Sequence, residues 1–298
     1  MRPQLLLMTY AAYGGTDPTQ LIDLGAVLEL HHQFLLVHDD LVDHDTIRYN
    51  GPNVVGYYQA ELSADNQAVA DAMGLLAGDL LFSFAHKLLL ESESYSNTQK
   101  AKLLTLMNDI NVDEVYGQQL DSYNIDPSPD AFSTERLTLI HTLKSARYTT
   151  QLPMQCAAIT RNLRSSERKK IDDFAVPFGV LFQLVDDYSD YFVSSSVSNK
   201  QTKFRDYRQG KVTYPLHIGL AQASKQDVAF LYGNLGDKDL SNESMTRIVS
   251  ILETSGAKDA SRTYIDAYFE KAYSTLDKLR ITPESKAQFA TLIDSFRV

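Results

Sequence analysis

The stretch "LLVHDDLVDHDTIR", residues 35–48, places four aspartates at the end of an apolar run. Asp39 and Asp43 are four residues apart, so in a helix both lie on one face, with Asp40 beside them. Carboxylates this close repel one another and cost free energy when they leave water. The pattern therefore predicts a helix whose last turns bind a positively charged group.

The same spacing returns in "FQLVDDYSDYF", residues 182–192, where Asp186, Asp187 and Asp190 again follow an apolar run. One such motif in an acidic protein is more often a solvated helix face. Two motifs, each preceded by similar apolar residues, favour a shared role. Clustered carboxylates attract Mg²⁺, which keeps several waters and bridges to substrate phosphates. The sequence therefore predicts Mg²⁺ ions that hold a diphosphate and stabilise its departure from carbon.

Composition narrows the class of protein. The chain has 298 residues, of which 44% are hydrophobic and 22% charged, as in soluble globular proteins. Its net charge of −10 disfavours a protein that coats nucleic acid or anionic membrane. The single cysteine, Cys156, excludes an internal disulfide and fits a cytoplasmic setting. We expect no transmembrane segment, since the apolar run "LLLMTYAAYGG" (5–15) is too short to cross a bilayer.

Helical periodicity extends along nearly the whole chain, while alternating strand patterns are almost absent. Sparse glycine and proline also favour long helices. We expect an all-α fold, one large bundle forming a single domain over residues 1–298, with capping residues at Ser133, Ser165 and Thr282. The polar run 194–211 has no apolar face and is expected to be a mobile loop. The predicted helices are 4–13, 18–44, 64–91, 97–123, 133–161, 166–193, 212–223, 226–233, 242–254, 257–279 and 283–296.

A series of stretches resembles, in the same order, the trans-isoprenyl diphosphate synthases (polyprenyl synthetases). Residues 28–48 and 182–192 are similar to the two aspartate-rich regions of that family. The smaller stretches that match are "AGDLLFSFA" (77–85), "GQQLD" (117–121), "TLKSA" (142–146) and "GKVTYPL" (210–216). The resemblance spans nearly the whole chain. It implies a helical bundle of the isoprenoid synthase type with a central active-site cavity, and a homodimer.

The resemblance also implies roles for individual residues. Mg²⁺ would be coordinated by Asp39, Asp43, Asp186 and Asp190, with Asp40 and Asp187 assisting. The allylic diphosphate would contact Arg48, Lys144, Lys200 and Lys211, with Gln183, Gln118 and Asp121 near the same cavity. On the residues alone, Lys144 shares a helix face with Ile140 and Tyr148, where a lone ammonium group is expensive unless it is paired. A lysine that extends its amine to solvent is the alternative.

Isopentenyl diphosphate, the second substrate that the resemblance implies, would bind a basic pocket matched here by Arg2 and His32. A lone histidine at such a position is more often a core residue, so this role depends on the resemblance. Two departures stand out. Relatives carry Gly-Lys-Arg-x-Arg-Pro where this chain begins "MRP", so we expect it to lack the upstream lysine and the family's first helix. Tyr49 stands where relatives usually have a second arginine, whose bidentate grip on phosphate a phenol does not reproduce.

The implied reaction is prenyl transfer. The allylic diphosphate ionises, the double bond of isopentenyl diphosphate attacks the cation, and the departed diphosphate takes the proton. The polar run 194–211, with Lys200, Arg205 and Lys211, would close over the diphosphates. Phe34 and Leu35, five and four residues before Asp39, would form the floor of the tunnel for the growing tail. An aromatic at the fifth position alone favours a C20 all-trans product within a C15–C20 range.

Three other functions account for part of the sequence. A class I terpene cyclase would share the fold and the first motif, but "DDYSD" does not fit its second metal motif. A phosphohydrolase with a His/Asp metal site would leave the second motif and "GKVTYPL" unexplained. A non-catalytic paralogue in a heteromeric synthase is favoured by Tyr49 and opposed by six intact motif aspartates.

Overall fold

The structure, a computed structural model, describes residues 1–48, 51–62, 66–122, 133–193 and 203–298. Helices dominate, and the described strands are a two-residue antiparallel pair, so the all-α prediction is confirmed. The elements are α1 (Arg2–Ala12), η1 (Pro18–Leu21), α2 (Ile22–Val42), β1 (Ile47–Arg48), β2 (Gly51–Pro52), α3 (Val54–Leu62), α4 (Gln67–Glu91), α5 (Asn97–Ser122), α6 (Thr134–Ile140), η3 (His141–Gln151), α7 (Leu152–Thr160), α8 (Ser165–Phe192), α9 (Arg205–Arg208), α10 (Tyr214–Gln222), α11 (Lys225–Asn234), α12 (Asn242–Thr254), α13 (Ala257–Leu276) and α14 (Pro283–Asp294).

The chain divides into two compact units. The first contains Met1–Met107 and Cys156–Asn162, and the second contains Asn108–Gln155 and Leu163–Val298. The chain passes from one unit to the other within α5, within α7 and again between α7 and α8, after Asn162. The first aspartate motif belongs to the first unit and the second motif to the second unit.

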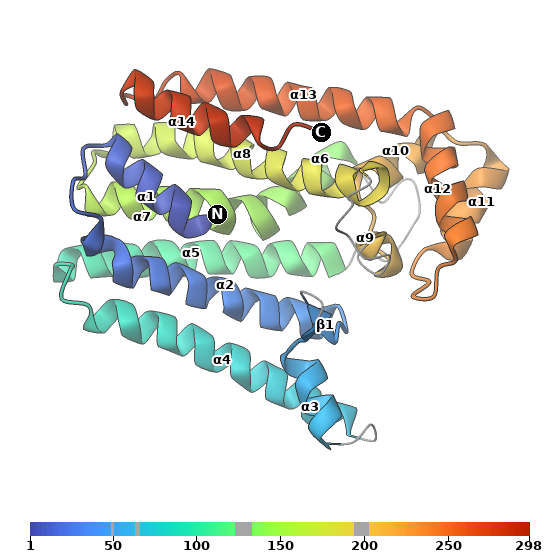
Figure 1. The fold of residues 1–298 in the computed structure, drawn as a ribbon, viewed down its shortest axis with the longest axis horizontal. Coiled ribbons are helices and arrows are strands. Elements are labelled where there is room, and N and C mark those ends of the chain that lie inside the picture. The colour runs from blue at the N-terminus through green and yellow to red at the C-terminus, as the bar shows by residue number, and fades with distance from the viewer. Residues whose placement is uncertain (49–50, 63–65, 123–132, 194–202) are drawn as a thin grey trace. The chain divides into compact units, whose positions relative to one another are not determined.

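In the first unit, α2 and α4 lie side by side, as Figure 1 shows in blue and cyan. Glycines allow this close approach. A methyl group at Gly78 would overlap the ring of His38, and one at Gly74 would press on Leu41 and Val55. The two helices therefore meet along the turns that lead to the first aspartate motif.

Helix α4 turns much of its length to solvent. Within the part of the chain that the structure describes, it is the one helix long and apolar enough to cross a membrane, and 22% of its most apolar stretch is buried. By itself this is weak evidence for a membrane segment. Its exposed side chains are Leu75, Leu76, Leu80, Phe84 and Leu90, each at least half exposed.

The second unit is built around α8, which packs against η3 on one side and α13 on another. A methyl group at Gly179 would overlap Ala146, so glycine is needed where α8 and η3 meet. Phe174 and Phe178 stack with ring centroids 5.7 Å apart, and Phe289 of α14 meets Phe174 edge-on. This core fixes the direction of α8, whose last turns carry the second aspartate motif.

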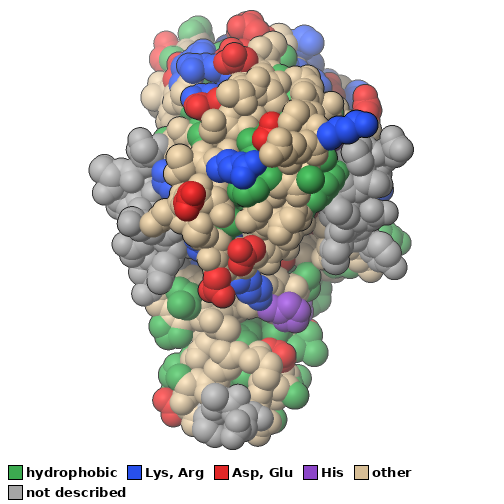
Figure 2. All heavy atoms as spheres, turned by 90° about the vertical axis from the view of Figure 1, so that its right-hand side faces the viewer, with side chains coloured by type: hydrophobic (Ala, Val, Ile, Leu, Met, Phe, Trp, Pro, Cys, Tyr) green, Lys and Arg blue, Asp and Glu red, His purple; other side chains and the backbone are tan. Residues whose placement is uncertain are grey.

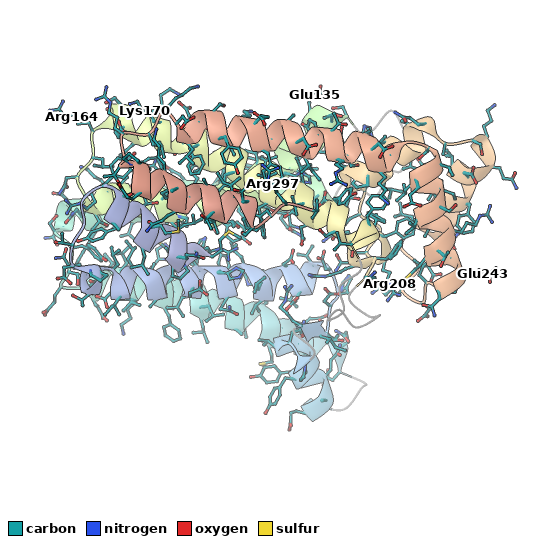
Figure 3. The ribbon with its side chains drawn as sticks, turned by 45° about the horizontal axis from the view of Figure 1, so that its top comes forward. Glu135, Arg164, Lys170, Arg208, Glu243 and Arg297 are labelled. Carbon is teal, nitrogen blue, oxygen red and sulfur yellow. The ribbon has the colours of Figure 1, made fainter. Side chains whose placement is uncertain are left out.

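Charged side chains lie around the outside of the second unit. Figure 3 shows Glu135, Arg164, Lys170 and Glu243 pointing away from the helices. On the face shown in Figure 2, acidic and basic side chains are interspersed over α11 and α12 rather than gathered by sign. Among the described residues, this face therefore offers no continuous basic surface of the kind that nucleic acid requires.

Several predicted elements need correction. The segment 194–211 was expected to lack an apolar face, but its described part forms α9, and Phe204 and Tyr207 are 3% and 0% exposed. Helix α3 was not predicted from the sequence. Ser133 and Thr282 cap their helices as expected, whereas α8 begins after Arg164 with no side-chain cap. Within the predicted helix 133–161, residues 141–151 adopt the wider π-helical form, which is often found at functional sites.

Candidate active site

The side chain of Arg48 forms hydrogen bonds and ion pairs with the first aspartate motif. Asp40 is 3% exposed, and it accepts hydrogen bonds from Arg48 Nη2 at 2.5 Å (to Oδ1) and from Nε at 3.2 Å (to Oδ2). The same Nη2 lies 3.5 Å from Asp39 Oδ2. Burial raises the pKa of Asp40, while the hydrogen bonds and charge of Arg48 act in the opposite direction. Asp40 therefore serves as the anchor of the motif, with Arg48 as its counter-ion.

Asp39 and Asp43 keep the helical relation that the sequence predicts. The amide of Asp43, the residue that ends α2, donates to the carbonyl of Asp39 at 2.9 Å. Both side chains are half-buried. The structure thus places the first and last aspartates one turn apart at the end of α2.

In the first unit, the charges of Arg2 and Arg48 act on the side chain of His32. Burial lowers the pKa of His32 to about 3, and the charges of Arg2 and Arg48 lower it further. His32 is therefore a neutral imidazole that feels the charges of two guanidinium groups, and its role in a basic pocket for a second diphosphate stays a prediction. Tyr49, the departure from the family pattern, lies outside the described residues.

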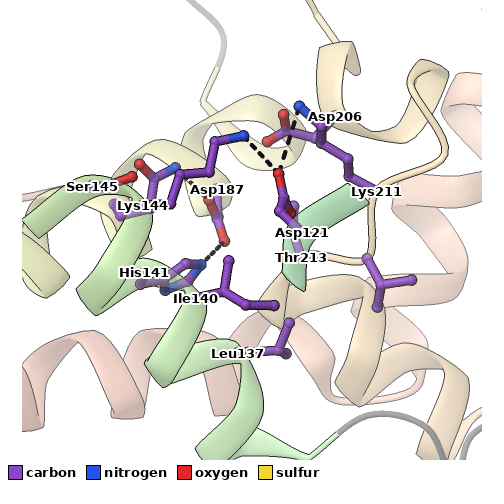
Figure 4. Close-up of a pocket in the computed structure, with 12 residues that line it drawn as sticks. Asp121, Leu137, Ile140, His141, Lys144, Ser145, Asp187, Asp206, Lys211 and Thr213 are labelled. Atoms are coloured by element: carbon purple, nitrogen blue, oxygen red, sulfur yellow. Dashed lines mark hydrogen bonds and ion pairs between the residues drawn. The ribbon is translucent and has the colours of Figure 1, made fainter. Parts of the chain in front are cut away.

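The second aspartate motif is anchored in a comparable way. Asp187 is 2% exposed, and its Oδ1 accepts a hydrogen bond from Gln183 Nε2 at 2.9 Å. Its Oδ2 lies 3.1 Å from His141 Nε2, a contact drawn in Figure 4. Burial lowers the pKa of His141, but the contact with Asp187 and the charges of Asp187, Asp121 and Asp206 together outweigh it, so the pKa of His141 is raised.

A small polar pocket lies beside this motif. Lys144 Nζ is 2.6 Å and Lys211 Nζ 3.8 Å from Asp121 Oδ2, so one carboxylate faces two ammonium groups (Figure 4). Lys144 is thus paired, as its place on an apolar helix face requires. The volume is about 70 Å³, room for a few waters. The lining residues are Asp121, Leu137, Ile140, His141, Lys144, Ser145, Gln183, Asp187, Asp206, Lys211, Val212 and Thr213.

The outer aspartates of the second motif sit in an acidic surrounding. Asp186 reaches solvent, yet the protein packed around its carboxyl group raises its pKa to about 7, and Asp206 adds to the rise. The pKa of Asp190 is also raised to about 7, by burial and then by Asp206. Its Oδ1 accepts from the amide of Arg205 at 3.3 Å. Its Oδ2 is buried with no hydrogen-bond partner among the described residues.

These carboxylates suit a hard divalent cation. Repulsion among Asp186, Asp190 and Asp206 is the kind of strain that a bound Mg²⁺ relieves, and Asp190 Oδ2 is a buried oxygen that needs a partner. Within the described ranges, no three His, Cys, Asp or Glu side chains converge as a complete ligand set. Mg²⁺ keeps several waters and takes oxygens from substrate phosphate, so an incomplete protein ligand set is what it uses.

Phe34 and Leu35, the predicted tunnel floor, are both buried, at 7% and 6% exposure. The Phe34 ring lies 5.0 Å from that of Phe82 on α4 and 4.9 Å from that of His38. An aromatic group from α4 thus supports Phe34 from the side. Lys200, predicted to contact the diphosphate, lies outside the described residues.

Comparison with known proteins shows the family of the chain. Residues 1–252 match the family model described as Polyprenyl synthetase. The chain belongs to the polyprenyl synthetase family. It is 24% identical over 298 residues to the geranylfarnesyl diphosphate synthase of Aeropyrum pernix, covering 99% of this chain and 88% of that one. It is 28% identical to the farnesyl diphosphate synthase of Geobacillus stearothermophilus, covering 77% of this chain and 73% of that one.

Solved structures share the fold of this polyprenyl synthetase. A geranylgeranyl pyrophosphate synthase from Corynebacterium glutamicum, complexed with isoprenyl diphosphate and magnesium, superimposes with a TM-score of 0.88. The two sequences are 24% identical, and the match covers 99% of this chain and 85% of the other. The predicted fold family is therefore confirmed.

Two titratable residues of the pocket were not predicted from the sequence. Asp206 lies five residues before Lys211 in a stretch read as a polar loop, and His141 lies three residues before Lys144. His141 could have been found from its helical spacing, because it lies three residues before Lys144, which was already a candidate residue. No sequence pattern predicted Asp206 as a site residue, because only the fold brings it close to the second motif.

Proposed function

We propose that this polyprenyl synthetase condenses isopentenyl diphosphate with an allylic diphosphate, in a Mg²⁺-dependent reaction, to give a short-chain all-trans prenyl diphosphate. The observation that carries the proposal is the pair of DDxxD motifs, each at the end of a long helix and each anchored through its second aspartate. Relatives named as geranylfarnesyl and farnesyl diphosphate synthases support the same reaction.

Lys144 and Lys211 are assigned to the allylic diphosphate. In the structure both lysines form ion pairs with the carboxylate of Asp121, which lies where a substrate anion would bind. A diphosphate brings more negative charge than one carboxylate, so it displaces Asp121 from the lysines when it binds. Lys200 and Arg48 are proposed as further contacts of this group.

Mg²⁺, when bound by Asp39, Asp43, Asp186 and Asp190, supplies positive charge that stabilises the departing diphosphate. The chain's own lysines add hydrogen bonds to the same oxygens. Because Asp40 is held by Arg48 and Asp187 by Gln183, these two aspartates keep the neighbouring ligands oriented.

Bond formation needs orientation and the exclusion of water more than a protein base. The allylic C–O bond breaks, the double bond of isopentenyl diphosphate attacks the allylic carbon, and the departed diphosphate accepts the proton that is lost. Arg2 and His32 are proposed to hold the diphosphate of isopentenyl diphosphate. Gln183 is proposed to line the allylic site.

Phe34, with Leu35 beside it, is proposed to stop the growing tail at C20. The ring of Phe82 leaves Phe34 little room to turn aside, and forcing atoms into a filled core is costly. Tail length is therefore set by steric exclusion.

A homodimer is proposed from the exposed apolar face of α4. Asp79, in the middle of that helix, has a side chain that is 63% exposed, and a carboxylate there opposes insertion into a bilayer. A second copy of the chain supplies a matching apolar face, as in the symmetric interfaces of most homo-oligomers.

The test of the reaction is Mg²⁺-dependent incorporation of isopentenyl diphosphate. Asp186→Asn should lower turnover about 100-fold, as loss of one charge-stabilising contact does elsewhere. Asp173→Asn, also on α8 but with an exposed side chain, is the matched control and should keep full activity. Turnover that survives complete chelation of Mg²⁺, or equal activity in the two variants, would refute the proposal.

Hydrocarbon release from an allylic diphosphate alone would instead favour the cyclase alternative. Activity that appears only after a second polypeptide is added would favour the regulatory subunit. Neither alternative is favoured by the relatives, whose names are those of diphosphate synthases.

A further inference from the structure

His141 is a buried polar residue in the pocket of the second unit that no step of the proposed reaction uses. Its side chain is 9% exposed and its Nε2 lies 3.1 Å from Asp187 Oδ2. The other oxygen of Asp187 accepts from Gln183 at 2.9 Å. Asp187 therefore has a protein partner on each side, a hydrogen bond from Gln183 of its own helix to Oδ1 and an ion-pair contact with His141 of η3 at Oδ2.

The packing of η3 against α8 fixes this contact. Thr150 Oγ1 donates to the carbonyl of Ala175 at 2.7 Å, joining the two helices about three turns before the motif. Gly179 lets the backbones approach, since a methyl group there would overlap Ala146. His141 begins the π-helical segment, and Figure 4 shows its ring turned toward Asp187.

We propose that His141 is a positioning residue for the second aspartate motif, which it serves by fixing the Asp187 carboxylate. This inference rests on the proposed function of the motif. Held from both sides, Asp187 gives its oxygens to the protein, and the cation is left to Asp186 and Asp190. Without His141, Asp187 regains an oxygen that competes for cation and loosens the geometry of its two neighbours.

A purely structural histidine would behave differently. Its replacement by an apolar side chain of similar size would change stability and leave cation binding as it was. A positioning histidine would change cation binding while the fold stays stable, and a side chain that restores the donor would rescue it. The two roles therefore separate in one set of variants.

The experiment compares wild type with His141→Leu, which removes the donor, and His141→Gln, whose Nε2 amide can replace it. His217→Leu, on α10 and outside the pocket, is the matched control. Binding of Mn²⁺ in the presence of inorganic diphosphate is followed by electron paramagnetic resonance, and thermal unfolding is measured alongside. Mg²⁺ dependence of turnover gives the second readout.

We expect His141→Leu to weaken Mn²⁺ binding and raise the Mg²⁺ needed for half-maximal turnover by about tenfold. His141→Gln should recover most of the loss, and His217→Leu should match wild type. Wild-type Mn²⁺ binding in His141→Leu, or no rescue by His141→Gln at unchanged stability, would overturn the inference. An inactive wild type that binds Mn²⁺ normally would count against the proposed reaction alone, because the binding comparison still tests His141.

Discussion

The second aspartate of each motif is the one that the protein itself surrounds most closely. Asp40 and Asp187 are the most buried members of their motifs, and each has an ion-pair partner in the chain, Arg48 or His141. A buried carboxylate without such a partner costs several kcal/mol, so the partner is as necessary as the aspartate itself.

Arg48→Met tests this at the first motif. Removing the guanidinium leaves the buried charge of Asp40 uncompensated, and we expect a loss of about 3 kcal/mol in the free energy of unfolding. Urea denaturation measures it. Lys169→Met breaks an exposed ion pair with Asp173 and should cost less than about 0.5 kcal/mol. Equal losses in the two variants would show that Asp40 does not depend on Arg48.

His31 should make the protein sensitive to mild acid. Its ring is 1% exposed, and burial, aided by His86 and Arg2, lowers its pKa to about 4 from 6.5. Between these pH values the unfolded chain binds the proton and the folded chain does not, so stability falls as the pH drops through this window. The total loss is about 3 kcal/mol.

His31→Leu removes this dependence. Between pH 7.5 and 5 the wild type should lose about 2 kcal/mol more of its free energy of unfolding than the variant. Urea denaturation at the two pH values checks it. Parallel pH profiles for the two proteins would mean that His31 is protonated in the folded state.

At the level of elements, close contact between helices sets the position of the site. A methyl group at Gly117 would overlap the backbone of Lys144, so α5 and η3 touch where Asp121 pairs with Lys144. This glycine belongs to the stretch "GQQLD" that carries part of the family resemblance. Its role is to bring the pocket's carboxylate within reach of the lysine.

Gly117→Ala should therefore destabilise the chain by about 1–3 kcal/mol and raise KM for the allylic diphosphate. Gly25→Ala in α2 is the matched control, because a methyl group there meets nothing within 4 Å. It should stabilise the chain by about 0.5–1 kcal/mol, since alanine favours helix. Urea denaturation and steady-state kinetics check both. A Gly117→Ala variant as stable as the Gly25→Ala variant would contradict the packing described here.

Most helices with clear apolar periodicity were predicted well, short ones included, whereas α3 and α9 were not predicted. The helix predicted at 242–254 agrees with α12 at both ends, and the long helices agree within a few residues. Helix α9 was missed because its two buried aromatics, Phe204 and Tyr207, stand in a polar stretch. The π-helical form of η3 depends on packing against α8, so local sequence carries no sign of it.

The candidate site was predictable where residues recur in a pattern and not where the fold alone gathers them. The two motifs, Lys144 and Lys211 follow from spacing and from the family resemblance. The anchoring of Asp40 by Arg48 does not, since Arg48 was expected to face the diphosphate. His141 and Asp206 became visible only with η3 and α9 in place.

For the whole molecule, the apolar face of α4 should govern the oligomeric state. The double variant Leu76→Lys, Leu80→Lys puts two charges on that face and should convert a dimer into a monomer of 33.4 kDa. Leu139→Lys places a charge on another exposed leucine and should leave the dimer intact. Sedimentation velocity measures the masses. A monomeric wild type at micromolar concentration would refute the role of this face.

The cytoplasmic location of the protein stays a prediction.

The central claim is that this chain elongates an allylic diphosphate. The most direct measurement incubates the purified chain with Mg²⁺, labelled isopentenyl diphosphate and, in turn, the C5, C10 and C15 allylic diphosphates, and sizes the products by mass spectrometry. We expect an all-trans C20 diphosphate as the longest main product. A longer product would keep the reaction and contradict Phe34 as the floor, whereas no incorporation with any of the three primers would contradict the claim itself.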